Sequence, residues 1–271
     1  VEQELIHAGL TTFLEDKYYE SGEDRIERLK DLISKCDAQF VANLIVIARK
    51  EFNLRSVSHL LIAELSKIHR GDSLIKNTIV EAAIRPDDLT ELVAYLGTPL
   101  PKQVKRGVRN ALLKYDRYQL AKYKGEGKKV SLVDIFNLTH PKVKHADKEQ
   151  KKAWKDLMTG KLVSFDTWET ELSNAKDDSA RKKSLESLLS ENKMGYMALL
   201  RNLNNLIKYD VSEKYQRIAI KKLIDPEEVK KSKQLPFRFV TAFDNVKGNR
   251  SFSDAISEAM DMAVSNTPEF K

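Results

Sequence analysis

Apolar residues recur along most of this chain at spacings of three and four, the pattern of one face of an α-helix. Alternating apolar and polar positions, which would indicate strands, are nearly absent, and only 10 glycines and 7 prolines occur in 271 residues. The pattern therefore predicts an all-α protein of roughly fifteen helices, each about 10–16 residues long and joined by short turns.

Several predicted helices begin at a residue that can cap the free N–H groups of a helix N-terminus. These starts are Asp37, Ser56, Asp87 or Asp88, Asp225 followed by Pro226, and Ser253. Gly97 is predicted to end the third of these helices, because glycine readily adopts the backbone conformation of a helix C-terminus.

So many short helices do not suit a four-helix bundle. They favour a helical-repeat superhelix, in which each pair of helices buries its apolar stripe against its neighbours. Because the sequence shows no regular period, the repeats are predicted to be irregular and HEAT-like, with about 40 residues each. No low-complexity linker divides the chain, so we predict one domain over residues 1–271.

Composition narrows the class of protein. No apolar stretch approaches the ~18 residues of a membrane-spanning helix, so no membrane contact is predicted. Cys36 is the only cysteine, which excludes an internal disulfide framework and a cysteine-based zinc cluster. A reducing, cytoplasmic location is the simplest expectation.

The positive charge of the chain is concentrated in one segment. The formal net charge is +7, but residues 101–155 alone contain 16 Lys or Arg against 5 Asp or Glu, a net +11. Residues 1–100 are net −5 and residues 156–271 are net +1. A charge that served only general solubility would be spread more evenly, so this segment is the candidate contact for an anionic partner.

The first part of this segment forms a predicted helix with two distinct sides. Val104, Val108, Ala111 and Tyr115 fall on one side, so Tyr115 is predicted to belong to the core. The opposite side carries Lys102, Lys105, Arg106 and Arg109. Like charges at these spacings repel one another by a few tenths of a kcal/mol per pair, and most charged helix faces mix signs to avoid this.

The second part surrounds a pair of glycines. Lys122, Lys124, Lys128 and Lys129 flank Gly125 and Gly127. The lysines could neutralise phosphate groups while the glycines let backbone N–H groups approach them. Tyr118 and Tyr123 could stack on bases or belong to the core. His140, at a predicted helix end, is either a packing residue or a contact next to this loop.

The glycine pair is not a nucleotide-binding P-loop. The required first glycine is replaced by Lys122, no strand precedes the loop, and no Ser or Thr follows the first lysine. Nor does the sequence contain a catalytic constellation, a metal-binding spacing or a cofactor motif. A HEAT-like repair enzyme would need an acid or base within the basic segment, where the only carboxylates belong to Asp116, Glu126, Asp134, Asp147 and Glu149. A HEAT-type scaffold for acidic proteins is the other alternative.

Several blocks of this sequence resemble the TROVE module of the Ro autoantigen family. They are residues 85–89 (RPDDL), 118–124 (YQLAKYK), 130–142 (VSLVDIFNLTHPK), 194–205 (MGYMALLRNLNN) and 234–242 (QLPFRFVTA), in the family's order. The resemblance covers nearly the whole chain and is nearest to bacterial or phage Ro homologues.

This resemblance implies a HEAT-like superhelix that can close into a ring and that binds RNA without chemistry of its own. The family holds small structured Y RNAs on its outer face and single-stranded 3′ ends of misfolded non-coding RNAs in its central hole. By position in the matching motifs, Lys122 and His140 are expected to contact Y-like RNA. Lys128 stands nearest to a family arginine, although a lysine cannot form the bidentate fork of an arginine.

The resemblance also implies partners and a domain boundary. Bacterial relatives point to an exoribonuclease such as polynucleotide phosphorylase, acting on RNA held by a monomer. Full-length Ro proteins continue into a von Willebrand A-type domain with an Asp-x-Ser-x-Ser motif. This sequence ends at residues 266–271 (NTPEFK), about where that domain would begin, so the expected domain is the TROVE-like module alone.

Overall fold

A computed structural model describes residues 1–11, 22–163 and 168–266 of the chain. Within those ranges the regular elements are seventeen α-helices and two short 3-10 helices, without a strand. The all-α class predicted from the apolar spacing is thereby confirmed. No helix in the described ranges is long and apolar enough to cross a membrane.

The chain packs as two compact units, Val1–Phe165 and Asp166–Lys271, and each is described by itself. Each unit encloses its own apolar core, and the two cores run from Leu5 to Leu162 and from Leu185 to Ala263. The expectation of one TROVE-like domain over residues 1–271 stays a prediction, as does closure into a ring.

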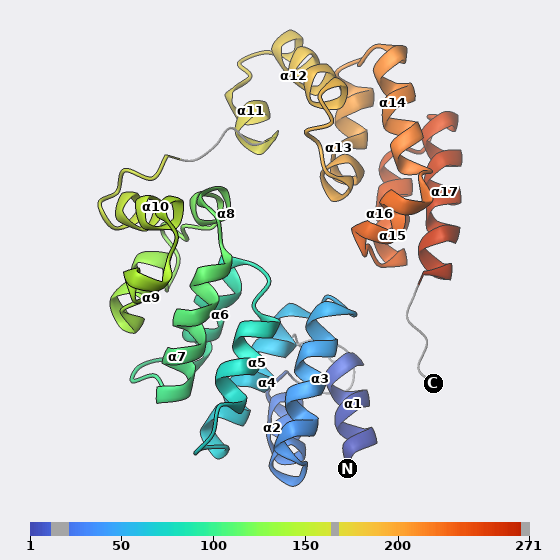
Figure 1. The fold of residues 1–271 in the computed structure, drawn as a ribbon. Coiled ribbons are helices and arrows are strands. Elements are labelled where there is room, and N and C mark those ends of the chain that lie inside the picture. Colours follow the sequence, from blue (N-terminus) through green and yellow to red (C-terminus); the bar gives the residue numbers. More distant parts are fainter. Residues whose placement is uncertain (12–21, 164–167, 267–271) are drawn as a thin grey trace. The chain divides into compact units, whose positions relative to one another are not determined.

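Unit 1 consists of helices that stack in two rows (Figure 1). Its α-helices are α1 (Glu2–Thr11), α2 (Gly22–Lys35), α3 (Ala38–Lys50), α4 (Arg55–Ile68), α5 (Leu74–Ala82), α6 (Pro86–Leu96), α7 (Lys102–Ala111), α8 (Arg117–Lys122), α9 (Leu132–Thr139) and α10 (Lys148–Met158). Two 3-10 helices, η1 (Leu112–Lys114) and η2 (Val143–His145), follow α7 and α9. In one row α3 contacts α5 and α5 contacts α7; in the other α2 contacts α4 and α4 contacts α6. Contact between each helix and the next but one is the packing of an irregular helical repeat, as predicted.

Helices α5 and α7 of unit 1 pack closely against each other, and Gly107 permits this. A Cβ atom at position 107 would lie 2.9 Å from the Cβ of Ile79 and 3.1 Å from the carbonyl oxygen of Lys76. Glycine normally weakens a helix interior by about 1 kcal/mol relative to alanine. Its presence in the middle of α7 is therefore explained by close packing against α5.

Unit 2 contains α11 (Trp168–Asn174), α12 (Asp178–Ser190), α13 (Tyr196–Lys208), α14 (Glu213–Leu223), α15 (Pro226–Ser232), α16 (Pro236–Asn245) and α17 (Arg250–Ser265). The long α17 packs against α14, α15 and α16, and α13 packs against α14 and α16. Phe239 of α16 and Phe252 of α17 are fully buried between these helices.

Two predicted helix starts are confirmed by their hydrogen bonds. The Asp37 carboxylate accepts from the Phe40 N–H at 3.0 Å and caps α3. The Asp225 carboxylate accepts from the N–H groups of Glu227 and Glu228 at 2.9 and 3.1 Å, with Pro226 as the first residue of α15.

Two other predicted caps are wrong, by two and by four residues. Ser56 does not cap its helix: α4 begins at Arg55, and the Ser56 hydroxyl donates to Glu91 at 2.7 Å. Ser253 lies inside α17, which the Asn249 side chain caps by accepting from the Phe252 N–H.

The start of α6 differs from the prediction in an informative way. The helix begins at Pro86 rather than at Asp87 or Asp88, because proline already has the backbone angle of a first helical residue. Asp88 lies in the first turn, and its carboxylate accepts from the N–H groups of Ile84 and Arg85, both at 2.8 Å. Gly97 ends the helix with a φ of 67°, as predicted.

Candidate nucleic-acid interface

Helix α7 separates its apolar and basic residues as the sequence predicted. Val104 and Val108 are fully buried against the core, and Tyr115, just after η1, is buried as well. Lys102, Lys105 and Arg106 are exposed, and Arg109 is half-buried. The helix therefore presents a row of cations to solvent while its other face is fixed against α5.

Very few cations of residues 101–155 are neutralised within the protein. Among the described residues, the only ion pairs of this segment join Arg117 to Asp156 at 2.5 Å and Lys124 to Glu126 at 3.5 Å. No described carboxylate lies within 4.0 Å of the four cations on α7. The mutual repulsion of those cations therefore has no internal compensation.

A cavity of about 620 Å³ lies next to the start of α7. Lys102 and Arg106 line it from α7, and Arg70 lines it from the turn after α4. His69 lines it too, but its ring nitrogen pairs with Asp72 at 2.9 Å. Arg70 is a cation that the sequence reading missed, since it lies more than 30 residues before α7 and only the stacking of helices brings it there.

The glycine pair after α8 forms a tight turn. Gly125 and Gly127 have φ angles of 75° and 77°, in the left-handed region that favours glycine, and the Lys128 N–H donates to the Gly125 carbonyl at 3.1 Å. Lys124 and Lys128 line a second cavity, of about 520 Å³, that reaches the start of α9 and the end of α10. Lys129 is exposed on the other side of the loop and lines a separate cavity with α6 and α9.

The N-terminus of α9, just after this loop, is already occupied by side chains. The Ser131 hydroxyl accepts from the Asp134 N–H, and the Asp134 carboxylate accepts from both the hydroxyl and the N–H of Ser131. These hydrogen bonds lower the pKa of the Asp134 carboxyl, which stays ionised. A phosphate near this loop would therefore meet lysine side chains rather than the end of α9.

Lys122 lies beside two tyrosine rings. Its Nζ is 5.9 Å from the centre of the Tyr118 ring and 6.0 Å from that of Tyr123. Tyr118 is 43% exposed, whereas Tyr123 is half-buried beneath the guanidinium of Arg85, which lies 5.3 Å from the ring centre. Tyr118 thus offers an accessible ring next to an exposed cation, and Tyr123 is mainly a packing residue.

His140 ends α9 in a left-handed conformation, with a φ of 48°. Its N–H donates to the Phe136 carbonyl at 2.9 Å, so its backbone is the C-terminal cap of the helix. Its side chain is exposed. The capping role of the backbone therefore leaves the imidazole available to a partner.

The nine predicted contact residues, which we call the basic surface, do not converge on a single pocket. They are Lys102, Lys105, Arg106, Arg109, Lys122, Lys124, Lys128, Lys129 and His140. Lys102 shares one cavity with Arg106, and Lys124 shares another with Lys128. The arrangement suits an extended anionic chain or a large anionic surface better than one small anion.

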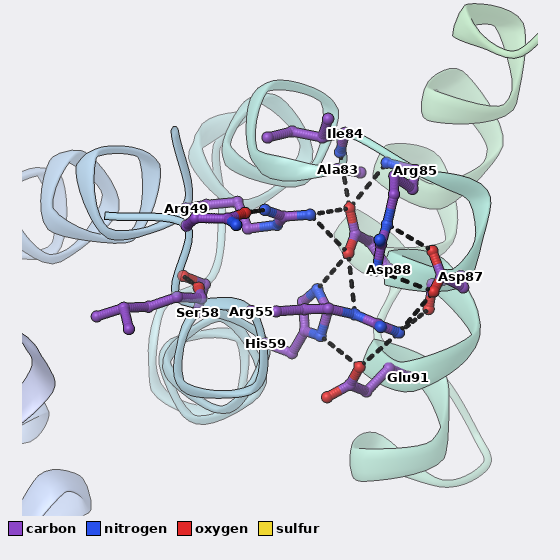
Figure 2. Close-up of polar contacts among 12 residues, drawn as sticks. Arg49, Arg55, Ser58, His59, Ala83, Ile84, Arg85, Asp87, Asp88 and Glu91 are labelled. Atoms are coloured by element: carbon purple, nitrogen blue, oxygen red, sulfur yellow. Dashed lines mark hydrogen bonds and ion pairs between the residues drawn. The ribbon is translucent and has the colours of Figure 1, made fainter. Parts of the chain in front are cut away.

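Unit 1 also contains a buried cluster of charged residues that the sequence reading did not predict (Figure 2). Asp88 is 1% exposed and pairs with Arg49, which is 3% exposed, through two contacts of 3.1 and 3.2 Å. Arg55 contacts Asp88 at 3.3 Å, Asp87 at 3.0 Å and Glu91 at 2.8 Å. Every carboxylate of the cluster thus faces a cation.

The buried cluster ties together three helices and a loop. Arg49 comes from α3, Arg55 from α4, and the carboxylates from the first turns of α6 (Figure 2). The Tyr115 hydroxyl donates to the carbonyl of Arg85 at 3.0 Å, just before α6. This bond links the residues that follow the basic helix α7 to the same loop.

His59 lies at the centre of the buried cluster and is almost fully buried. Its Nε2 is 3.4 Å from Asp88 and its Nδ1 is 3.5 Å from Glu91. Burial alone would lower the pKa of His59, but the contacts with these two carboxylates outweigh it and raise the pKa. Burial alone would likewise raise the pKa of Glu91, yet His59, Ser56 and Arg55 lower it to about 2.

Comparisons with known proteins match part of this chain to a known family model. Residues 152–266, which include all the described helices of unit 2, match the family model named TROVE domain. The resemblance to the TROVE family is confirmed. The basic surface extends from the start of α7 to the residue after α9, and all of it lies before the residues that match the TROVE model.

Two curated proteins similar to this chain are both named Telomerase protein component 1. The mouse protein is 35% identical over 97 residues, which cover 34% of this chain and 4% of that protein. The rat protein is 36% identical over 86 residues, 32% of this chain and 3% of that protein. The similarity therefore spans only a small part of these relatives.

Over most of this chain, the fold is similar to that of a solved structure. The crystal structure of the RO (RSR) protein of Deinococcus radiodurans matches with a TM-score of 0.63 and covers 93% of this chain and 60% of that one. The sequences are 20% identical, so this comparison bears on the fold alone.

Proposed function

We propose that this TROVE-family chain binds RNA through the basic surface of unit 1. The observation that supports this proposal most strongly is the uncompensated charge of α7, whose four cations have no described carboxylate within 4.0 Å. A polyanion supplies that compensation. Each phosphate that contacts a lysine or arginine also releases condensed counterions, which is the main source of affinity for nucleic acids.

The finer part of the proposal concerns which RNA is bound. Small structured Y-like RNAs contact Lys122 and His140, the cations of α7 contribute to RNA binding, and the protein also holds single-stranded 3′ ends of misfolded non-coding RNAs. Exposed Tyr118, next to Lys122, supplies a ring on which a base can stack. The protein acts as a cytoplasmic monomer that holds RNA without chemistry of its own, and an exoribonuclease such as polynucleotide phosphorylase acts on the RNA.

A HEAT-type scaffold for acidic proteins is the second candidate function, because unpaired lysines attract carboxylates as well as phosphates. The two functions differ in competition and in salt dependence. The logarithm of the RNA-binding constant falls linearly with the logarithm of salt concentration, and the number of phosphates contacted sets the slope.

A titration at two salt concentrations tests the proposed function. The ligands are a small structured RNA with a single-stranded 3′ tail, the same RNA without the tail, and a DNA duplex. We expect salt-sensitive binding that is tightest for the tailed RNA. Equal, weak binding to all three ligands would contradict RNA recognition and favour the protein scaffold.

Variants then locate the contact. We expect Lys122→Ala with Lys124→Ala, and separately His140→Ser, to weaken binding of the structured RNA. The matched control is Lys230→Ala with Lys231→Ala, which removes the same charge from exposed positions on α15 of unit 2. Thermal unfolding confirms that each variant is folded. Unchanged affinity in both test variants would show that this surface does not bind the RNA.

A further inference from the structure

Unit 2 contains a pocket whose lining includes no residue of the basic surface. It has a volume of about 440 Å³ and lies between α11, α12 and α13. Its lining includes Trp168, Glu169, Arg181, Asn202, Asn205 and Tyr209. Two aromatic rings, a guanidinium and two side-chain amides therefore surround one small volume.

The two asparagines are unusual for the apolar side of a helix. Asn202 is 4% exposed, and its Nδ2 donates to the Ala198 carbonyl of its own helix at 2.8 Å. Its Oδ1 accepts from Nδ2 of Asn205 at 2.9 Å. The Asn205 amide is thus held in one orientation, while its Oδ1 accepts no hydrogen bond from the described residues. The Oδ1 atom of Asn205 and the second N–H of its amide therefore offer the pocket one hydrogen-bond acceptor next to one donor.

Flat side chains border the same volume. The Arg181 guanidinium lies 5.6 Å from the centre of the Tyr209 ring and donates to the Tyr209 hydroxyl at 3.2 Å. Lys208 lies 5.2 Å from the same ring. These contacts fix the guanidinium plane, and the half-buried Trp168 adds an indole plane from α11. Flat side chains stack on aromatic ligands, and stacking contributes about 1–3 kcal/mol of binding free energy per base in single-stranded nucleic acids.

The charges of the pocket do not favour an anion. Glu169 contributes a carboxylate to the lining, and Arg181 is paired with Asp178 at 3.4 Å. A phosphate would meet one carboxylate directly and a cation that is already partly neutralised. A planar, uncharged ligand with donors and acceptors on its edge is the better match.

We propose that this pocket holds one unstacked nucleobase of a single-stranded RNA. The base stacks on the Trp168 and Arg181 planes, and its edge pairs with the Asn205 amide, which can accept from and donate to neighbouring edge atoms. This inference rests on the proposed function for its choice of RNA, although the pocket itself lies outside the basic surface. Its role is to recognise bases, whereas the basic surface recognises phosphates.

Tryptophan fluorescence tests the pocket without relying on the basic surface. Trp154 and Trp168 are the two tryptophans of the chain, so Trp154→Phe leaves Trp168 as the single reporter. The four nucleoside monophosphates are titrated, with ribose 5-phosphate as the control without a base. We expect saturable quenching by at least one nucleotide and none by the control. Absence of saturable quenching by all four, or equal quenching by ribose 5-phosphate, would overturn the inference.

Binding of tailed RNA separates the two proposals. The tail is made with normal nucleotides and, in a second RNA, with abasic ones that keep the phosphates. Wild type should bind the normal tail about tenfold more tightly than the abasic tail because the bases stack, and Asn205→Leu, which removes the contacts to the base edge, should reduce the difference. Asn204→Leu, at the exposed neighbouring position on α13, should preserve it. Trp168→Leu, the second test variant, removes a stacking plane and should abolish most of the difference.

The outcomes are distinguishable. If the wild type binds both RNAs equally, or if both test variants keep the preference for bases, the pocket is not a base site and RNA binding stands. If no RNA binds at all, the proposed function fails, and the fluorescence titration alone decides what the pocket accepts.

Discussion

Unit 1 contains two groups of charged residues, one in which opposite charges are paired and one in which like charges stand together. In the buried cluster around Asp88, three carboxylates are matched by three arginines and a histidine at 2.8–3.5 Å. On α7, four cations stand next to one another and no described carboxylate lies within 4.0 Å. The two regions are linked through Tyr115, whose hydroxyl donates to the Arg85 carbonyl.

This difference in pairing indicates different roles for the two groups of charged residues. Buried ions must be paired, because removal from water is costly unless partners and hydrogen bonds replace the missing solvation. Exposed cations have no such requirement, so their lack of partners costs only mutual repulsion. We attribute the buried cluster to the architecture of the unit, whereas the exposed row is the part of the proposed contact with an external anion that the predictions below test.

The largest expected effect follows from breaking the buried cluster. Asp88→Asn keeps the side-chain shape but leaves Arg49 without its counter-charge in a buried site. We expect the free energy of unfolding to fall by about 3–5 kcal/mol, measured by denaturant titration.

The matched control for that prediction is an exposed ion pair. Glu81→Gln breaks the ion pair between Glu81 and Lys50. Lys50 Nζ lies 2.7 Å from the Glu81 carboxylate, and the side chains of Lys50 and Glu81 are 40% and 55% exposed. This substitution should lower the free energy of unfolding by about 0–1 kcal/mol. Equal losses of stability in the two variants would mean that burial does not distinguish the regions.

A smaller effect is expected from Gly107→Ala, which tests how α7 is held. The added Cβ would meet Ile79 at 2.9 Å, so α5 and α7 must separate. Overpacking of this kind costs about 1–3 kcal/mol, against a gain of about 1 kcal/mol in helix propensity. We expect a net loss of stability by thermal unfolding. A stabilised variant would show that the close packing of the basic helix is not required.

The pH dependence of stability should give the smallest effect. The pKa of His59 is raised in the folded protein by Asp88 and Glu91, although burial opposes this. Its contribution is therefore fully present below the ordinary pKa of 6.5 and disappears as the pH rises through the folded value. The difference in unfolding free energy between wild type and His59→Gln should shrink above pH 6.5. A difference that is constant from pH 5 to 9 would mean that His59 is neutral in the cluster.

Local features could be predicted from the sequence, and long-range pairings could not. The cap at Asp37, the Asp225-Pro226 start and the two-sided helix α7 each depend on residues within one or two turns. The buried cluster joins Arg49 to Asp88, 39 residues apart. His59 stood among apolar residues of a helix, and nothing near it in the sequence revealed its carboxylate partners.

The candidate site was predictable to the same extent. The exposure of Lys102, Lys105 and Arg106 follows from helical spacing and is confirmed. Arg70 was missed because it reaches the same cavity from the turn after α4. The roles of the basic surface in RNA binding remain predictions, since they depend on a partner rather than on the fold.

One measurement tests most directly whether unpaired cations mark the RNA contact: the salt dependence of RNA affinity in two variants from which equal charge is removed. The test variant changes the four cations of α7 to glutamine, namely Lys102, Lys105, Arg106 and Arg109. The control changes four lysines of unit 1 that pair with carboxylates, namely Lys30, Lys35, Lys50 and Lys67.

The slope of log affinity against log salt concentration should become shallower by about 0.7 for each single-strand phosphate that the variant no longer neutralises. We therefore expect a decrease of up to about 3 in the test variant and no change in the control. Equal changes in both variants would contradict a role for unpaired cations, because they would show that RNA responds to the net charge of the protein and not to the row on α7.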